Sequence, residues 1–125
     1  MGYKNIDNPC DLIVYRDGTL NLFELKAIHG NTLNFKSHIR ENQWNELLKY
    51  SYIPGVNAGI ICWFIDLDKT VFIDIQDLEF MKNVGKKSFN IKWLSESPVT
   101  EIIGKKKRTF FDYALDTFLK KISYE

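Results

Sequence analysis

Hydrophobic and polar residues alternate in the first part of the chain and then change to a helical spacing. The runs Leu12–Tyr15 and Leu20–Phe23 flank Asp17-Gly18, a pair that commonly joins two antiparallel strands through a tight turn. These runs therefore predict a β-hairpin. From about His38 to Tyr52, apolar residues recur every three or four positions, which predicts an amphipathic helix with Ser37 as its N-cap.

Further along, apolar runs follow one another with short polar stretches between them. Residues 57–67 are almost continuously apolar and predict a buried strand, with 70–75 as its partner strand across a tight turn. The remaining expected elements are a short helix over 76–84 ended by Gly85, an edge strand over 89–94 and a last helix from Thr109. The resulting order, β-β-α-β-β-α-β-α, predicts an α/β domain with a mixed β-sheet flanked by helices.

Size and composition are those of one folded domain spanning residues 1–125, with 45% hydrophobic and 26% charged residues. No apolar run reaches the length of a membrane span, and the N-terminus lacks the apolar stretch of a signal peptide, so we expect a cytoplasmic protein. Cys10 and Cys62 have no partner at metal-ligand spacing, which argues against a zinc site. The net charge of +1 argues against a uniformly basic surface but allows local basic clusters.

Three polar residues of the predicted hairpin carry the candidate chemistry. Asp11 precedes the first strand, and Glu24-Leu25-Lys26 follows the second run, where alternation places Glu24 and Lys26 on one face. Two carboxylates can bind a hard divalent cation, and a nearby ammonium group can orient water or neutralise charge on a phosphoryl group. The pattern is typical of metal-assisted phosphodiester hydrolysis, and it is also found on ordinary exposed hairpins.

Gln43 lies on the apolar stripe of the predicted helix, four residues after Ile39 and four before Leu47. A buried amide needs hydrogen-bond partners. If the helix packs beside the hairpin, Gln43 can contact a carboxylate of the site or a metal-bound water. If Gln43 lies at the margin of the stripe, its side chain reaches solvent, and the pattern leaves both alternatives open.

The Asp…Glu-x-Lys spacing resembles the PD-(D/E)xK nuclease superfamily, and a longer match indicates one family within it. Residues 23–27 (FELKA), 33–35 (LNF) and 38–43 (HIRENQ) resemble the RecU-type Holliday junction resolvases. That family carries an Asp, an F-E-x-K strand, a Phe-containing segment and a helix with a Gln. The apolar strand at 57–61 and the basic turn before a closing helix at 105–113 also fit, so the resemblance covers most of the chain.

This resemblance implies a restriction-endonuclease-like fold and a homodimeric endonuclease, dependent on Mg²⁺ (or Mn²⁺), that cleaves branched DNA such as four-way junctions. Such enzymes occur in phages and Gram-positive bacteria. Carried over to this chain, Asp11 and Glu24 would be metal ligands, and the carbonyl of Leu25 would be a further oxygen ligand. Lys26 would be the catalytic lysine, and Gln43 would be a supporting residue of the catalytic site.

The chain departs from the family pattern at its N-terminus. Only ten residues precede Asp11, and none of them is a Glu, whereas the family has an N-terminal helix that supplies a further acid. Asp7 could take that place geometrically. The alternative hypothesis is therefore a catalytically inactive nuclease fold that binds DNA or a host protein. A third is a fragment of a longer protein or one completed by a partner subunit.

Basic residues that could contact DNA fall in two parts of the chain. Lys36 and Arg40 lie near the start of the helix that carries Gln43. The second group precedes the last predicted helix, where anions are favoured at a helix N-terminus. Its members are Lys105, Lys106, Lys107 and Arg108, with Lys86 and Lys87 further upstream. A solvated loop is the alternative interpretation of this group.

Overall fold

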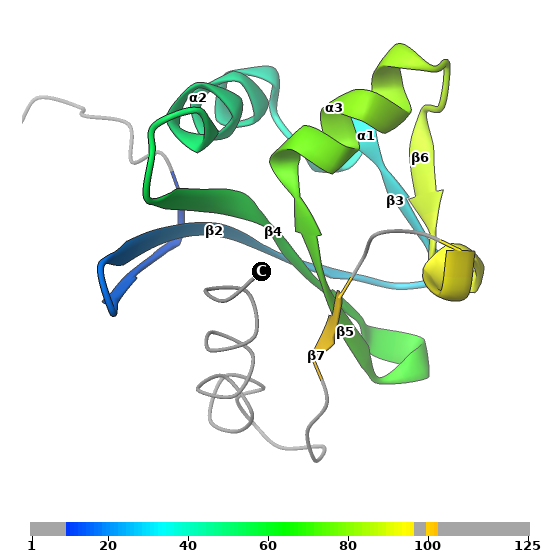
Figure 1. The fold of residues 1–125 in the computed structure, drawn as a ribbon. Helices are drawn as coiled ribbons and strands as arrows, with labels where there is room; N and C mark the ends of the chain where they lie inside the picture. The colour runs from blue at the N-terminus through cyan, green and yellow to red at the C-terminus, as the bar shows by residue number, and fades with distance from the viewer. Residues whose placement is uncertain (1–9, 97–99, 103–125) are drawn as a thin grey trace, which may run out of the picture.

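The structure is a computed structural model that describes residues 10–96 and 100–102 (Figure 1). Its strands are β1 (Leu12–Arg16), β2 (Thr19–Ile28), β3 (Thr32–Asn34), β4 (Val56–Phe64), β5 (Lys69–Asp74), β6 (Ser88–Asn90) and β7 (Thr100–Ile102). Its helices are α1 (Phe35–His38), α2 (Glu41–Ser51) and α3 (Ile75–Asn83), with short 3-10 helices over Ile65–Leu67 and Ile91–Glu96. The helix predicted from Thr109 lies outside the described residues.

Two sheets organise these strands. One has five strands in the order β1-β2-β4-β5-β7, and β3 pairs with β6 in a second, smaller sheet. β2 and β4 are parallel while the other neighbours are antiparallel, so the large sheet is mixed and the predicted α/β class is confirmed. The parallel pair requires a crossover connection, which β3, α1 and α2 supply. None of the helices in the described part of the chain is long and apolar enough to span a membrane.

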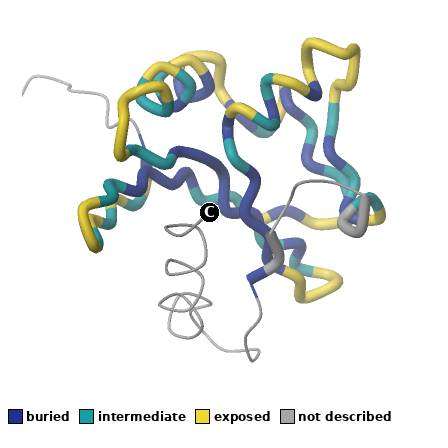
Figure 2. Tube along the Cα trace, viewed as in Figure 1, coloured by how far each residue is buried: buried dark blue, intermediate teal, exposed yellow. Residues whose placement is uncertain are grey.

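Hydrophobic residues cover both faces of the large sheet. On one face Leu22 and Ile60 pack with Leu47 of α2, within a core that also includes residues of α3. Figure 1 shows α2 and α3 on the same side of this sheet, and Figure 2 shows that burial is greatest along the central strands. On the other face, the rings of Phe23 and Phe72 meet edge to face with centroids 5.5 Å apart. Burial on both faces explains why the β4 sequence is almost continuously apolar.

The helix predicted from His38 to Tyr52 is interrupted in the structure. Asn34 caps α1 by accepting the backbone N–H groups of Lys36 (3.1 Å) and Ser37 (3.0 Å). The chain is then extended at Arg40 before α2 begins. The predicted N-cap, Ser37, is wrong because it lies within α1, and α2 begins after Arg40, whose side chain makes no capping hydrogen bond.

Other differences from the sequence prediction concern the strands. The strand predicted over 57–67 ends at Phe64, where the chain forms a 3-10 turn closed by Asp68 in the left-handed region (φ 48°). The edge strand predicted over 89–94 covers only Ser88–Asn90 in the structure, because its partner β3 has three residues. The chain then continues as a 3-10 helix. The short strands β3 and β7 were not predicted, since their pairing depends on residues distant in sequence.

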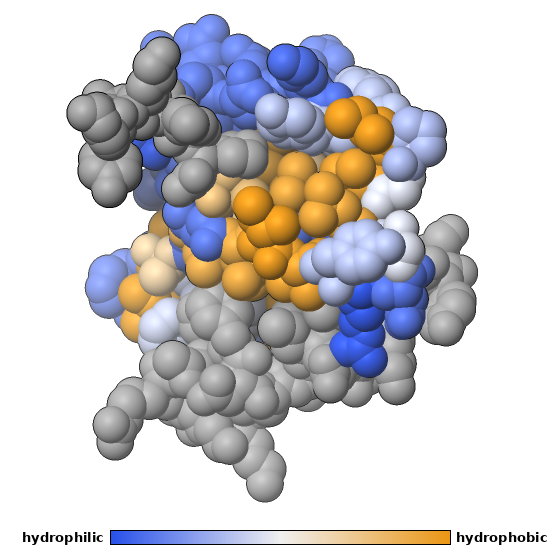
Figure 3. Space-filling view, turned by 90° about the vertical axis from the view of Figure 1, so that its left-hand side faces the viewer, coloured by the Kyte–Doolittle hydropathy of each residue, from blue (hydrophilic) through white to orange (hydrophobic). Residues whose placement is uncertain are grey.

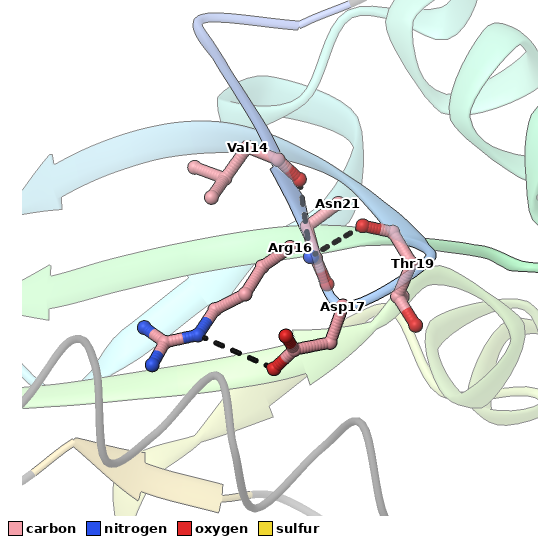
Figure 4. Close-up of polar contacts among 5 residues, drawn as sticks. All are labelled: Val14, Arg16, Asp17, Thr19 and Asn21. Carbon is pink, nitrogen blue, oxygen red and sulfur yellow. Dashed lines mark hydrogen bonds and ion pairs between the residues drawn. The ribbon is translucent and has the colours of Figure 1, made fainter.

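The hairpin predicted at Asp17-Gly18 is confirmed. Both residues have positive φ, 51° and 81°, as a two-residue turn that matches the twist of its strands requires. Figure 4 shows the side-chain contacts at this end, where the amide of Asn21 donates to the carbonyls of Val14 (3.1 Å) and Thr19 (3.5 Å). Arg16 Nε lies 3.7 Å from the Asp17 carboxylate. Side chains as well as the backbone ladder therefore fix the closed end of the hairpin.

The side of the molecule that carries this hairpin presents a hydrophobic surface (Figure 3). On the edge strand β1, Ile13 is 56% exposed and Tyr15 is 72% exposed. Tyr52 and Ile53, which follow α2, are exposed as well. Exposed apolar groups that gather in this way are typical of a surface that binds another molecule.

Candidate functional site

A β-bulge at the open end of the hairpin directs Asp11 towards β2. Leu12 pairs with Phe23, yet the N–H of Asp11 also donates to the Phe23 carbonyl, at 3.0 Å. Two consecutive residues thus oppose one, and bulges of this kind turn side chains in new directions. Asp11 Oδ2 accepts the backbone N–H of Leu25 at 3.1 Å, so the carboxylate lies against the Glu-x-Lys segment.

Glu24 and Lys26 lie on one face of β2, as the alternation predicted. Glu24 Oε2 is 3.4 Å from Lys26 Nζ, and the two side chains are 3% and 22% exposed. Phe23 and Leu25 belong to the hydrophobic cluster on the opposite face of the sheet. The arrangement is a buried carboxylate whose lysine partner can still reach solvent.

The environment of Glu24 raises the pKa of its carboxyl group above the ordinary value. Burial raises the pKa of the Glu24 carboxyl, and Asp11 raises it further by a side-chain hydrogen bond and by repulsion, while Lys26 acts in the opposite direction. Two acids that influence one another in this way are close enough to share a proton or a cation. Such paired carboxyl groups are common at functional sites.

Two buried side-chain atoms in the described part of the chain have no hydrogen-bond partner: Glu24 Oε1 and Gln43 Oε1. Both are oxygen acceptors. An unsatisfied buried acceptor costs about 1–3 kcal/mol, so its persistence needs a physical explanation. A hard cation, or the waters around one, satisfies oxygens of this type.

Gln43 lies in the first turn of α2, on the helix side that faces the sheet. It is 7% exposed, and Leu47, one turn further on, is fully buried, so the alternative in which Gln43 reaches solvent is excluded. β4 follows α2 closely and begins at Val56, beside Leu20 of β2. Gln43 therefore lies between α2 and the large sheet, on the side of the sheet to which Glu24 and Lys26 also point.

The backbone of Leu25 offers a further oxygen. The N–H and C=O groups of one strand residue point to the same side of the strand. The N–H of Leu25 points to Asp11, so the Leu25 carbonyl also points to the side of β2 on which β1 lies. β1 begins at Leu12, so Leu25 lies just beyond the paired part of the hairpin. The carbonyl and the two carboxylates are thus directed to the same edge of the sheet.

A scan against protein-family models gives no match for this chain, and a search of curated proteins finds no significantly similar one. The interpretation of the site therefore rests on its geometry. Over residues 10–96 and 100–102, no three His, Cys, Asp or Glu side chains gather closely enough to hold a metal ion. The acidic component is accordingly a pair, which suffices for an ion such as Mg²⁺ that keeps several waters.

Cys10 belongs to the surroundings of this acid pair, and its position directly before Asp11 is the one sequence signal for this. The thiol is 6% exposed and donates to the Leu12 carbonyl at 3.4 Å. Burial raises the pKa of Cys10, and the charges of Glu24 and Asp11 raise it further. A thiol kept protonated in this way is a packing residue rather than a ligand.

The predicted DNA-contact residues are only partly described. Lys36 in α1 and Arg40 at the start of α2 are exposed and precede Gln43 by seven and three residues. Both therefore lie on the crossover that also supplies Gln43. Asp7 and the basic residues Lys105, Lys106, Lys107 and Arg108 lie outside the described residues.

Without metal, we expect the buried Glu24 to make stability depend on pH. Because its pKa is raised above the ordinary value of 4.5, the folded state binds this proton more tightly than the unfolded state does. The free energy of unfolding therefore falls as the pH rises from about 4.5 through the folded-state pKa. Near pH 4, Glu24→Gln and the wild type should have the same free energy of unfolding. At pH 8, that of Glu24→Gln should be higher by about 1 kcal/mol.

Urea unfolding in EDTA at both pH values measures this difference. The corresponding change at the exposed residue Glu41 serves as the control. A Glu24→Gln variant that is less stable than the wild type at pH 8 would contradict the prediction.

Proposed function

We propose that this protein is a metal-dependent endonuclease that cleaves branched DNA, of the Holliday junction resolvase type. The observation that carries the proposal is the acid pair of Asp11 and Glu24 beside Lys26, with an unpaired buried oxygen on Glu24. This is the donor set of a hard-cation site next to a mobile positive charge. The RecU-like spacing of the motif supports branched DNA as the substrate class.

Mg²⁺ or Mn²⁺ suits the oxygens of this site. The carboxylates of Asp11 and Glu24 and the carbonyl of Leu25 would hold the ion, and the unpaired Glu24 Oε1 is the atom that most needs such a partner. When bound, the ion would polarise the scissile phosphate and lower the pKa of a water molecule.

Lys26 and Gln43 would complete the chemistry. The Lys26 ammonium lies 3.4 Å from Glu24 and is partly exposed, so it can donate to an attacking water or to a phosphoryl oxygen without leaving the acid pair. Gln43, on α2, has an amide N–H donor and an acceptor oxygen without a partner. Both groups would hydrogen-bond to a water molecule and orient it. Because Glu24 is buried, these charges act where little water screens them.

The direct test is cleavage of a labelled four-way junction and of a linear duplex with the same sequence, in Mg²⁺, Mn²⁺ or EDTA. We expect symmetric cuts in the junction with either metal, slow cutting of the duplex and none in EDTA. DNA or protein binding without any cleavage would instead favour the inactive nuclease fold. The observation that favours this second function is that the described residues group two acids rather than three.

We further propose that two copies pair through β1, the edge strand of the large sheet. Resolution of a junction needs two sites related by two-fold symmetry. An antiparallel pairing centred on Val14 would place Ile13 opposite Tyr15 of the second copy, and these are the exposed apolar residues of the strand. Aromatic and β-branched residues form favourable cross-strand pairs.

This pairing predicts that the wild type sediments as a dimer and that the double variant Ile13→Lys/Tyr15→Lys sediments as a monomer. Both side chains are exposed, so the fold should be retained and the circular dichroism spectrum unchanged. Lys69→Ala, an exposed change on β5, which does not neighbour β1 in the sheet, is the control. Sedimentation velocity over a range of concentrations measures the state, and a variant that remains dimeric would refute the β1 interface.

A further inference from the structure

Basic residues from separate segments of the chain lie close together around α1 and the turn between α3 and β6. The N–H of Phe35, in α1, donates to the carbonyl of Lys87 at 3.0 Å, and Asn34 pairs with Ser88 in the small sheet. Lys36 therefore lies on the segment adjoining Lys87. Figure 1 shows β3 and α1 beside β6 at this end of the molecule. We define the basic surface as Lys36, Arg40, Lys82, Lys86 and Lys87, all of which are exposed.

Two ammonium groups of the basic surface rest on aromatic rings. Lys82 Nζ lies 5.1 Å from the centroid of the Trp44 ring, and Lys86 Nζ lies 4.4 Å from that of Trp93. A cation–π contact positions an ammonium group without neutralising its charge. Glu79 accepts the indole N–H of Trp44 at 2.9 Å, and Glu41 directly follows Arg40 in the chain.

None of the five residues forms an ion pair with an Asp or Glu of the described segments. Elsewhere in those segments, Arg16, Lys26 and His29 each have a carboxylate partner. The basic surface therefore keeps its positive charge available for an external anion.

The basic surface adjoins the segment of α2 that carries Gln43. Arg40 precedes Gln43 by three residues, and Trp44, which supports Lys82, directly follows Gln43. From there the surface extends across α1 to the turn between α3 and β6, where the N–H of Lys86 donates to the Met81 carbonyl at 2.9 Å. A chain of phosphates that enters the site could thus follow these residues away from it.

We propose that the basic surface binds the phosphate backbone of one duplex arm of the DNA substrate, independently of its sequence. This inference rests on the proposed function and adds the path that the DNA takes. Lysine contacts to phosphates fix the position of DNA and carry no base information. They also release counterions, so their number can be read from the dependence of affinity on salt.

The test compares two double variants in the Glu24→Gln background, which prevents cleavage. Lys86→Ala/Lys87→Ala removes two charges from the basic surface, whereas Lys49→Ala/Lys69→Ala removes two exposed charges elsewhere. Fluorescence anisotropy measures binding to a labelled four-way junction and to a linear duplex between 50 and 200 mM salt. Over this range, a protein that makes six phosphate contacts loses affinity by about 10³-fold or more.

We expect Lys86→Ala/Lys87→Ala to lower the slope of log affinity against log salt by about 2 for both DNAs, and the control to leave it unchanged. If the two double variants have equal slopes and circular dichroism shows both to be folded, the basic surface does not bind the DNA, even if the wild type cuts junctions. If Lys86→Ala/Lys87→Ala lowers the slope but the wild type does not cleave DNA, the basic surface binds DNA and the catalytic proposal is refuted.

Discussion

Glu24→Gln is expected to lower metal-dependent cleavage of a four-way junction by about 10³-fold. A metal ligand contributes several kcal/mol to stabilisation of the transition state, and about 4 kcal/mol corresponds to this factor. Glu24 is also the ion-pair partner of Lys26, at 3.4 Å, so the variant loses both the anionic oxygen and the contact that positions the ammonium group. Single-turnover cleavage with excess protein measures the chemical step without the effect of product release.

The substitution keeps the size of the side chain and one acceptor oxygen, so the variant should fold and bind the junction. Glu46→Gln, a partly exposed change on α2, is the matched control and should cleave like the wild type. Retention of one tenth or more of the wild-type rate by Glu24→Gln, with Mg²⁺ dependence intact, would show that the cation is held elsewhere.

Gly59→Ala is expected to destabilise the protein by about 3 kcal/mol, the upper part of the range for overpacked cores. A Cβ at this position would lie 2.4 Å from the carbonyl oxygen of Ile73 and 2.7 Å from Cε1 of Phe72. The first of these atoms belongs to the backbone of β5 and cannot move aside as a side chain does. Since β4 is central in the large sheet, the strain would be relieved only by separating strands.

Gly30→Ala provides the comparison. No atom lies within 4 Å of a Cβ at Gly30, but its φ of 82° is left-handed, so this change should cost about 1–2 kcal/mol for conformation alone. Urea unfolding of both variants separates steric from conformational strain. If Gly59→Ala is no less stable than Gly30→Ala, the close approach of β4 and β5 at this point is not as tight as described.

The elements that the sequence predicts well are those specified by neighbouring residues. Asp17-Gly18 between alternating runs determines a hairpin locally, and the same alternation places Glu24 and Lys26 on one face. The N-cap of the predicted helix was misjudged because Ser37 lies within α1, a separate short helix that Asn34 caps. Only the pairing of β3 with β6, about 55 residues apart, selects Asn34.

The candidate site shows the same limit. The sequence identified Asp11 and Glu24 by type and spacing, but the bulge that turns Asp11 onto the N–H of Leu25 depends on the register of the hairpin. Lys82 had no sequence signal as a member of the basic surface. Its place there follows from the packing of α3 against α2, which brings it over Trp44.

The crossover between the parallel strands β2 and β4 makes the proposed activity a late product of folding. The acid pair forms from an antiparallel hairpin, and hairpins close in microseconds. Gln43 reaches its place only when α2 has packed on the sheet, which requires the pairing of β2 with β4, two strands distant along the chain. A chain with a formed hairpin and an undocked helix would carry both acids while Gln43 was not yet packed against the sheet. Cleavage of DNA would therefore begin only after the core is complete, so an unfinished molecule would not cut DNA.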